Sequence, residues 1–133
     1  MARQAVLSQS QPKPPSYQAI TGEAALHQVV GSPDVAHSQL ARLTDVAHLE
    51  HVSIRVLPYT QGARLWVGNP FHLLLHETPG QLTVAGVEYF NRSKFVEDEV
   101  EVTEHEEVYA RLVDATLDES KSLELVERIM SAP

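Results

Sequence analysis

Residues 31–59 read GSPDVAHSQLARLTDVAHLEHVSIRVLPY, and this stretch changes from a helical pattern to a strand pattern. Ser32 can cap a helix, Pro33 suits its first position, and Asp34 suits the positive end of the helix dipole. Apolar side chains then recur at 36, 40, 43 and 47, which is the spacing of one helical face. The pattern predicts a helix over 31–51, with His37 and His48 off its apolar face.

The strand pattern follows directly. Val52, Ile54 and Val56 alternate with polar residues up to Pro58, which is typical of a half-buried strand over 52–59. Residues 60–69 contain two glycines and the only tryptophan, Trp66, and are predicted to form a loop. On the other side of the helix, residues 17–26 fit either a strand or an irregular helix, and residues 1–16 read as a terminal segment with a proline-rich linker.

Two further strands and two helices are predicted towards the C-terminus. Residues 70–77 and 82–90 read as the strands of a hairpin whose turn is TPGQ, and the first is apolar enough to be covered on both faces. Thr103 and Glu106 have the capping-box spacing, so we expect a helix from there to about Leu117. Asp118 can cap a last helix. The inward residues of these helices are expected to be Tyr109, Leu112, Val113, Thr116 and Leu117, then Leu123, Val126 and Ile129 or Met130.

This order of elements predicts an α+β fold, in which a small, mostly antiparallel sheet of three to four strands packs with about three helices. The chain has 133 residues, enough for one domain over 17–133. It contains no cysteine, which excludes disulfides, thiolate metal sites and cysteine nucleophiles. No apolar run approaches a membrane span and the N-terminus lacks the core of a signal peptide, so a soluble cytoplasmic protein is expected.

The net charge of −8 is concentrated near the C-terminus. Residues 1–95 hold 7 Lys/Arg and 6 Asp/Glu, whereas residues 96–133 hold 3 and 12. A chain of this charge is repelled by phosphate backbones, so direct nucleic-acid binding is not expected. The segment EDEVEVTEHEE, 97–107, is either a solvated linker with a helix start or a docking patch for a basic protein partner.

Several of these segments resemble a known family. The run from residue 23 to 63 is similar to the C-terminal domain of actinobacterial XRE-type helix-turn-helix regulators, the antitoxin-like group, a domain of unknown function. The matching residues are Glu23 to Leu26, Val30-Gly31, Gln39-Leu40, Val52 through Pro58 and Gly62-Ala63, then Phe71, Glu88 and Glu97-Asp98. The resemblance implies a regulator-type domain, here without the DNA-binding helix-turn-helix that normally precedes it.

The chain departs from that family at three places. Arg64-Leu65-Trp66 replaces a His-Pro-Gly-like stretch, His76 replaces an aromatic residue, and Gly86 replaces a tyrosine. The last change removes a large side chain from the sheet, which opens a cavity unless Trp66 or another neighbour refills it. A ligand site there would be lined by Trp66, Phe71, Leu74, Gly86 and Tyr89.

The histidines of FHLLLHE, 71–77, are the candidate chemical groups. His72 and His76 share a strand face but stand about 13 Å apart, too far to chelate one metal ion, and no metal or cofactor is expected. One histidine oriented by Glu88 could move protons near neutral pH. The hairpin register decides this: one register places His72 opposite Val87, and a loop one residue longer places it opposite Glu88. The plainer alternative is two hydrogen-bonded boundary histidines.

Two functions therefore compete. The first is a ligand-sensing or protein-interaction domain of a regulator-type protein, with a small apolar or mixed-polarity ligand, a basic protein partner or a second copy of the chain as its partner. The alternative is a small cofactor-free enzyme of specialised metabolism, a cyclase, isomerase or lyase, using His72 or His76 with Glu88. Resemblance in fold does not decide between them.

Overall fold

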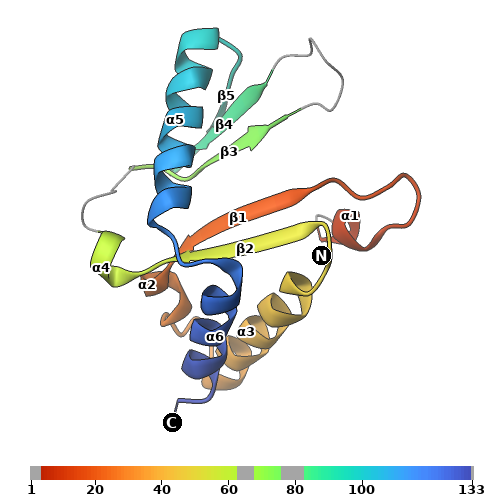
Figure 1. Ribbon diagram of the computed structural model, residues 1–133, viewed down its shortest axis with the longest axis vertical. Coiled ribbons are helices and arrows are strands. Elements are labelled where there is room, and N and C mark those ends of the chain that lie inside the picture. The colour runs from red at the N-terminus through yellow and green to blue at the C-terminus, as the bar shows by residue number, and fades with distance from the viewer. Residues whose placement is uncertain (1–3, 63–67, 76–82, 133) are drawn as a thin grey trace. The chain divides into compact units, whose positions relative to one another are not determined.

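The computed structural model describes residues 4–62, 68–75 and 83–132, and it has the α+β character expected from the sequence (Figure 1). The chain divides into two compact units. The first unit is Met1–Gly62 with Thr116–Pro133, and the second unit is Ala63–Ala115. The expected antiparallel sheet is present as a sheet of three strands in the second unit, and the first unit adds a parallel pair of strands.

The first unit is built on a strand–helix–strand crossover. After the short helix α1 (Ala5–Ser8), strand β1 (Tyr17–Gly22) leads through helix α2 (Glu23–Leu26) and helix α3 (Pro33–Ala47) to strand β2 (Val52–Leu57). The ambiguous segment 17–26 is thus a strand followed by a helical turn. Parallel strands need such a long connection, and β1 and β2 pair in parallel from Tyr17↔Val52 to Gly22↔Leu57.

The predicted helix over 31–51 is confirmed in its core and its cap. The Ser32 side chain accepts a hydrogen bond from the Val35 amide at 3.3 Å, and Pro33 is the first helical residue. The residues at 36, 40, 43 and 47 are partly buried, whereas His37 and His48 are exposed. The alternation in β2 is also confirmed, because Val52, Ile54 and Val56 are buried. Helix α4 (Tyr59–Gly62) corrects the start of the predicted loop over 60–69.

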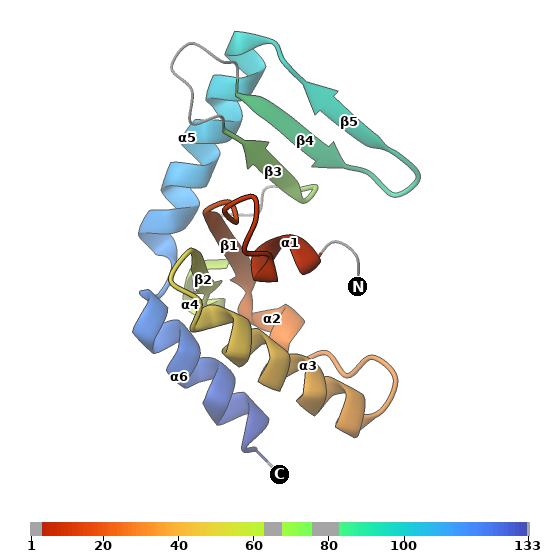
Figure 2. The ribbon, with the colours of Figure 1, turned by 90° about the vertical axis from the view of Figure 1, so that its right-hand side faces the viewer.

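Helix α6 (Glu119–Met130) completes the first unit, beside α3 and against β2 (Figure 2). Asp118 caps it as expected, accepting from the Lys121 amide at 2.8 Å. Leu26, Val56, Leu125 and Val126 form the buried core, and Leu40, Leu43, Leu117 and Ile129 pack against it. The core therefore sits where α3 and α6 cover one face of the parallel pair.

The second unit is a three-stranded sheet with one helix. Strands β3 (Phe71–Leu74), β4 (Val84–Glu88) and β5 (Ser93–Val96) lie in that order and pair antiparallel, and helix α5 (Glu99–Ala115) packs on the sheet. The hairpin of β3 and β4 is confirmed, while its TPGQ turn lies outside the described residues. Strand β5 was not expected from the sequence, because it is four residues long and runs into the acidic segment.

The prediction that β3 is covered on both faces is wrong. Leu73 packs against a core of Ala85, Val96 and Val102, but the next residue, Leu74, is 50% exposed. Since successive side chains on a strand point to opposite faces, α5 covers one face of this sheet, and the other is open in the described residues.

The predicted capping box at Thr103 is also wrong, because α5 begins four residues earlier. The Asp98 carboxylate accepts from the Glu101 amide at 3.0 Å, whereas the Thr103 hydroxyl donates to the Glu99 carbonyl inside the helix. Aspartate caps helices at least as well as threonine does, and Glu101 stands three positions after Asp98, at the capping-box spacing.

This correction leads to a test. We expect Asp98→Ala to lower the free energy of unfolding by about 1 kcal/mol, the usual cost of a lost cap. Thr103→Ala should change it by less than about 0.5 kcal/mol, because alanine is the better helix former. Urea unfolding of the full chain measures both. A larger loss from Thr103→Ala than from Asp98→Ala would restore the capping box to residue 103.

Candidate functional site

On the open face of the second unit, His72 is the first residue of a row that crosses all three strands. His72 pairs with Gly86, and Gly86 pairs with Phe95. Cross-strand partners point to the same side, so these residues share one face. The register is neither of the two considered from the sequence, because Phe71 lies opposite Val87 and His72 opposite Gly86.

The His72 ring occupies the volume that Gly86 leaves free. A Cβ atom built on Gly86 would clash with His72 Nε2, so the ring rests directly on the glycine backbone. The same ring meets Phe95 edge-on, with centroids 6.2 Å apart at 77°. The cavity expected at Gly86 is therefore refilled by His72. Trp66, the other candidate for this role, lies outside the described residues.

This close contact predicts a measurable coupling. We expect Gly86→Ala to destabilise the chain while His72 is present, because the methyl group displaces the ring. In a His72→Ala background the same change should stabilise, since alanine loses less entropy than glycine in a strand. A double-mutant cycle by urea unfolding should give a coupling of about 1 kcal/mol.

Gly22 provides the control for this cycle. A Cβ built there meets nothing within 4 Å, so Gly22→Ala should add to His72→Ala without coupling. Equal, additive effects of Gly86→Ala in both backgrounds would show that His72 does not rest on residue 86.

The structure does not join His72 to Glu88. Both side chains are exposed on the open face, but Glu88 stands opposite Ser93, two residues beyond the partner of His72. Within the described residues no hydrogen bond connects their side chains. His76 lies outside the described residues. The catalytic roles of these three residues stay a prediction.

The residues predicted to line a ligand site are divided between the two faces of the sheet. Leu74 and Gly86 lie on the open face with His72, whereas Phe71 is on the covered face. There the Phe71 ring meets the His105 ring edge-on, with the ring centroids 5.2 Å apart. Tyr89 follows β4, and the Arg92 guanidinium lies over its ring, 5.5 Å from the centroid. Apart from Trp66, which is not described, these residues do not converge on one cavity.

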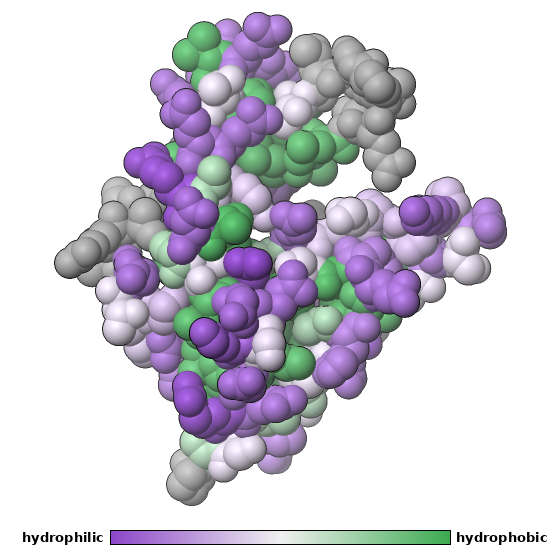
Figure 3. Space-filling view, in the orientation of Figure 1, coloured by the Kyte–Doolittle hydropathy of each residue, from purple (hydrophilic) through white to green (hydrophobic). Residues whose placement is uncertain are grey.

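The open face carries exposed apolar side chains. Leu74 is 50% exposed and Phe95 62% exposed, and Leu75 and Phe90, beyond the ends of β3 and β4, are exposed as well. Figure 3 shows hydrophobic surface over β3. Exposed apolar side chains gathered on one face are a feature of interaction surfaces.

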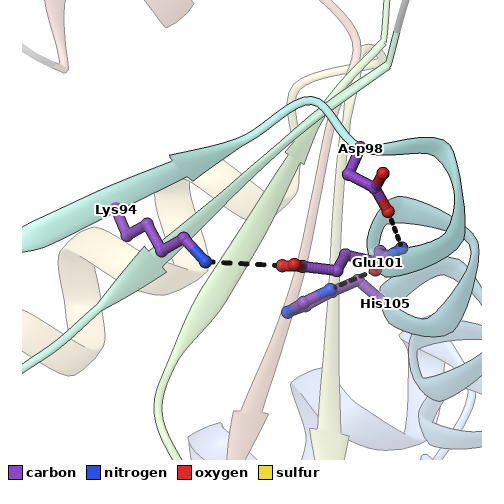
Figure 4. Close-up of polar contacts among 4 residues, drawn as sticks. All are labelled: Lys94, Asp98, Glu101 and His105. Carbon is purple, nitrogen blue, oxygen red and sulfur yellow. Dashed lines mark hydrogen bonds and ion pairs between the residues drawn. The ribbon is translucent and has the colours of Figure 1, made fainter.

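Helix α5, which packs on the covered face of the sheet, begins with an acidic segment. Lys94 of β5 reaches Glu101 of α5 with a 3.4 Å ion pair, and the Glu101 carbonyl accepts from His105 Nδ1 at 2.6 Å (Figure 4). Seven acidic side chains of the segment 97–107 are exposed: Glu97, Asp98, Glu99, Glu101, Glu104, Glu106 and Glu107. Lys94 is the one Lys or Arg that forms an ion pair with them in the described residues.

A further cluster in the first unit was missed from the sequence. The Glu23 carboxylate accepts from the Tyr59 amide at 2.8 Å and lies 3.7 Å from His27 Nε2, and the His27 ring stacks on Tyr59. The cluster joins α2 to the start of α4. The spacing of four residues between Glu23 and His27 could have indicated their contact from the sequence. The contact with Tyr59 could not be predicted in this way, because Tyr59 lies 36 positions from Glu23.

No described helix combines the length and the apolar character that crossing a bilayer requires. Likewise, no three His, Asp or Glu side chains gather at a possible metal site in the part of the chain that the structure describes.

Comparison with known proteins places the chain in a family. It matches no curated protein and no solved structure. A family model described as "Domain of unknown function (DUF5753)" matches residues 1–128, which is nearly the whole chain. The protein therefore belongs to this DUF5753 family.

Proposed function

We propose that this chain is a non-catalytic interaction domain of a regulator-type protein, which binds a basic protein partner through its second unit. The observation that carries the proposal is the open sheet face, on which Leu74 and Phe95 are about half to two-thirds exposed on either side of His72. Apolar surface that no described element covers supplies the binding energy for a protein partner.

The negative charge of the second unit favours a basic protein as the partner. Residues 63–115 hold 4 Lys/Arg and 10 Asp/Glu, which gives −6, whereas the rest of the chain holds 6 and 8, which gives −2. The excess is carried by the exposed acidic segment 97–107. A partner that presents an apolar strip flanked by Lys and Arg would be steered to this unit and bound there more tightly at low salt.

The regulator assignment rests on the finer resemblance to the C-terminal domain of actinobacterial XRE-type, antitoxin-like regulators. In such a protein this domain would be the partner-binding half, and a separate helix-turn-helix would bind DNA. The acidic charge of the chain agrees with that division of roles, because it disfavours direct contact with DNA.

Site-specific photocrosslinking tests the proposal. A photoreactive phenylalanine analogue at Phe95 should crosslink one protein in the native cells, and the same analogue at His37, exposed on α3, should not. The captured protein is then purified and its affinity measured by calorimetry at two salt concentrations. We expect weaker binding at high salt, and a loss of at least tenfold for the double variant Glu104→Lys, Glu107→Lys.

Three results would contradict the proposal. Equal crosslinking from 95 and 37 would show that the open face is not a preferred surface. An affinity that does not change with salt concentration would contradict binding of a basic partner. A crosslink to a second copy of the chain would replace it with self-association.

A further inference from the structure

A cavity in the first unit, away from the open sheet face, has the features of a small-molecule site. It lies between α3, β2 and α6 and has a volume of about 140 Å³. Most of its wall is aliphatic, formed by Leu43, Ala47, Ile54, Leu123 and Val126, and its polar side chains are Glu119, Ser120 and Ser122. Figure 3 shows hydrophobic surface between the polar residues of α3 and α6.

The volume limits the size of an occupant. An apolar protein cavity of about 150 Å³ stays dry and accepts benzene. By volume, this partly open cavity is matched by a compact group of about six carbon atoms.

The polar groups at the cavity limit the chemistry of that occupant. The Ser122 hydroxyl is already used twice, because it accepts from the Val56 amide at 2.9 Å and donates to the Leu117 carbonyl at 3.3 Å. Glu119 accepts one hydrogen bond, from Ser53 Oγ at 2.7 Å, and forms no ion pair in the described residues. A carboxylate has about four lone-pair sites, so most of its accepting capacity remains.

We propose that this cavity binds a small primary amine whose ammonium group meets Glu119 and whose apolar body, about the size of a six-membered ring, fills the space between α3 and α6. An anionic ligand is repelled by Glu119, and a neutral ligand of the same shape fills the cavity without forming an ion pair with Glu119. The site is independent of the proposed docking face, since all of its lining residues belong to the first unit.

Titration of the full chain with three probes tests this site. Benzylamine, benzyl alcohol and benzoate share one ring and differ in charge. We expect benzylamine to shift the amide NMR signals of Ile54 and Leu123 saturably, benzyl alcohol to do so more weakly, and benzoate not to do so. Saturable shifts by benzoate equal to those by benzylamine, or no shifts at these amides by any probe, would overturn the proposal.

Variants separate the cavity from the carboxylate. Ala47→Phe should fill the space and abolish the shifts by both binding probes. Glu119→Gln should weaken benzylamine about two- to fivefold, the scale of a solvent-exposed ion pair, and leave benzyl alcohol unchanged. Glu124→Gln, exposed on the same helix, is the matched control and should change neither. An unchanged affinity for benzylamine in Glu119→Gln would show that the ammonium group does not bind Glu119.

Discussion

Leu125→Ala should lower the free energy of unfolding of the first unit by about 3 kcal/mol, within the range found for buried leucines. Leu125 is 6% exposed and belongs to the core cluster with Leu26, Val56 and Val126. The substitution removes several methyl and methylene groups from contact and leaves a void that rigid neighbours refill only in part.

Urea unfolding monitored by NMR signals of the first unit measures this loss. Leu75→Ala removes the same atoms at a position that is 69% exposed, and it should cost less than about 0.5 kcal/mol. Similar losses at both positions would show that the cluster around Leu125 is not the core of this unit.

Ser122→Ala has the second largest expected effect, about 2 kcal/mol, although it removes one oxygen atom. The Ser122 side chain is 1% exposed, and its hydroxyl accepts from Val56 N–H and donates to the Leu117 carbonyl. Alanine leaves a buried amide without an acceptor, and the cost of that desolvation exceeds the net worth of the bond.

Amide hydrogen exchange gives a direct measure of this contact. Exchange at Val56 should accelerate in Ser122→Ala by roughly the factor that corresponds to the lost stability, about thirtyfold for 2 kcal/mol. Ser120→Ala, exposed two residues earlier, should leave it unchanged. Unchanged exchange at Val56 in Ser122→Ala would exclude the proposed hydrogen bond.

Elements with local signals were predictable from the sequence. Helices α3 and α6 each have a capping side chain next to an apolar period, and both caps were identified correctly at Ser32 and Asp118. For helix α5 the pattern predicted a cap at Thr103, whereas the structure has the cap five residues earlier, at Asp98. Packing decides between them, because Val102 lies before the predicted start and is needed in the core with Ala85 and Val96.

Features that depend on pairing between distant segments were not predictable. The parallel pairing of β1 with β2 joins residues 35 positions apart, and no residue in either strand specifies it. The register of β3 on β4 was limited to two alternatives, and the structure has a third. Here the glycine at 86 decides the local fit, since a strand without a side chain there accommodates the His72 ring.

The outer edge of β2 has a consequence for how the protein behaves at high concentration. Val56 donates its N–H to Ser122 Oγ, and its carbonyl accepts from the Leu117 amide at 2.9 Å. An exposed strand edge with free N–H and C=O groups is a template for strand addition by another chain, the first step of amyloid growth. At Val56 this edge is already closed by Ser122 of α6 and by Leu117, which precedes the helix, so strand addition there requires α6 to detach first.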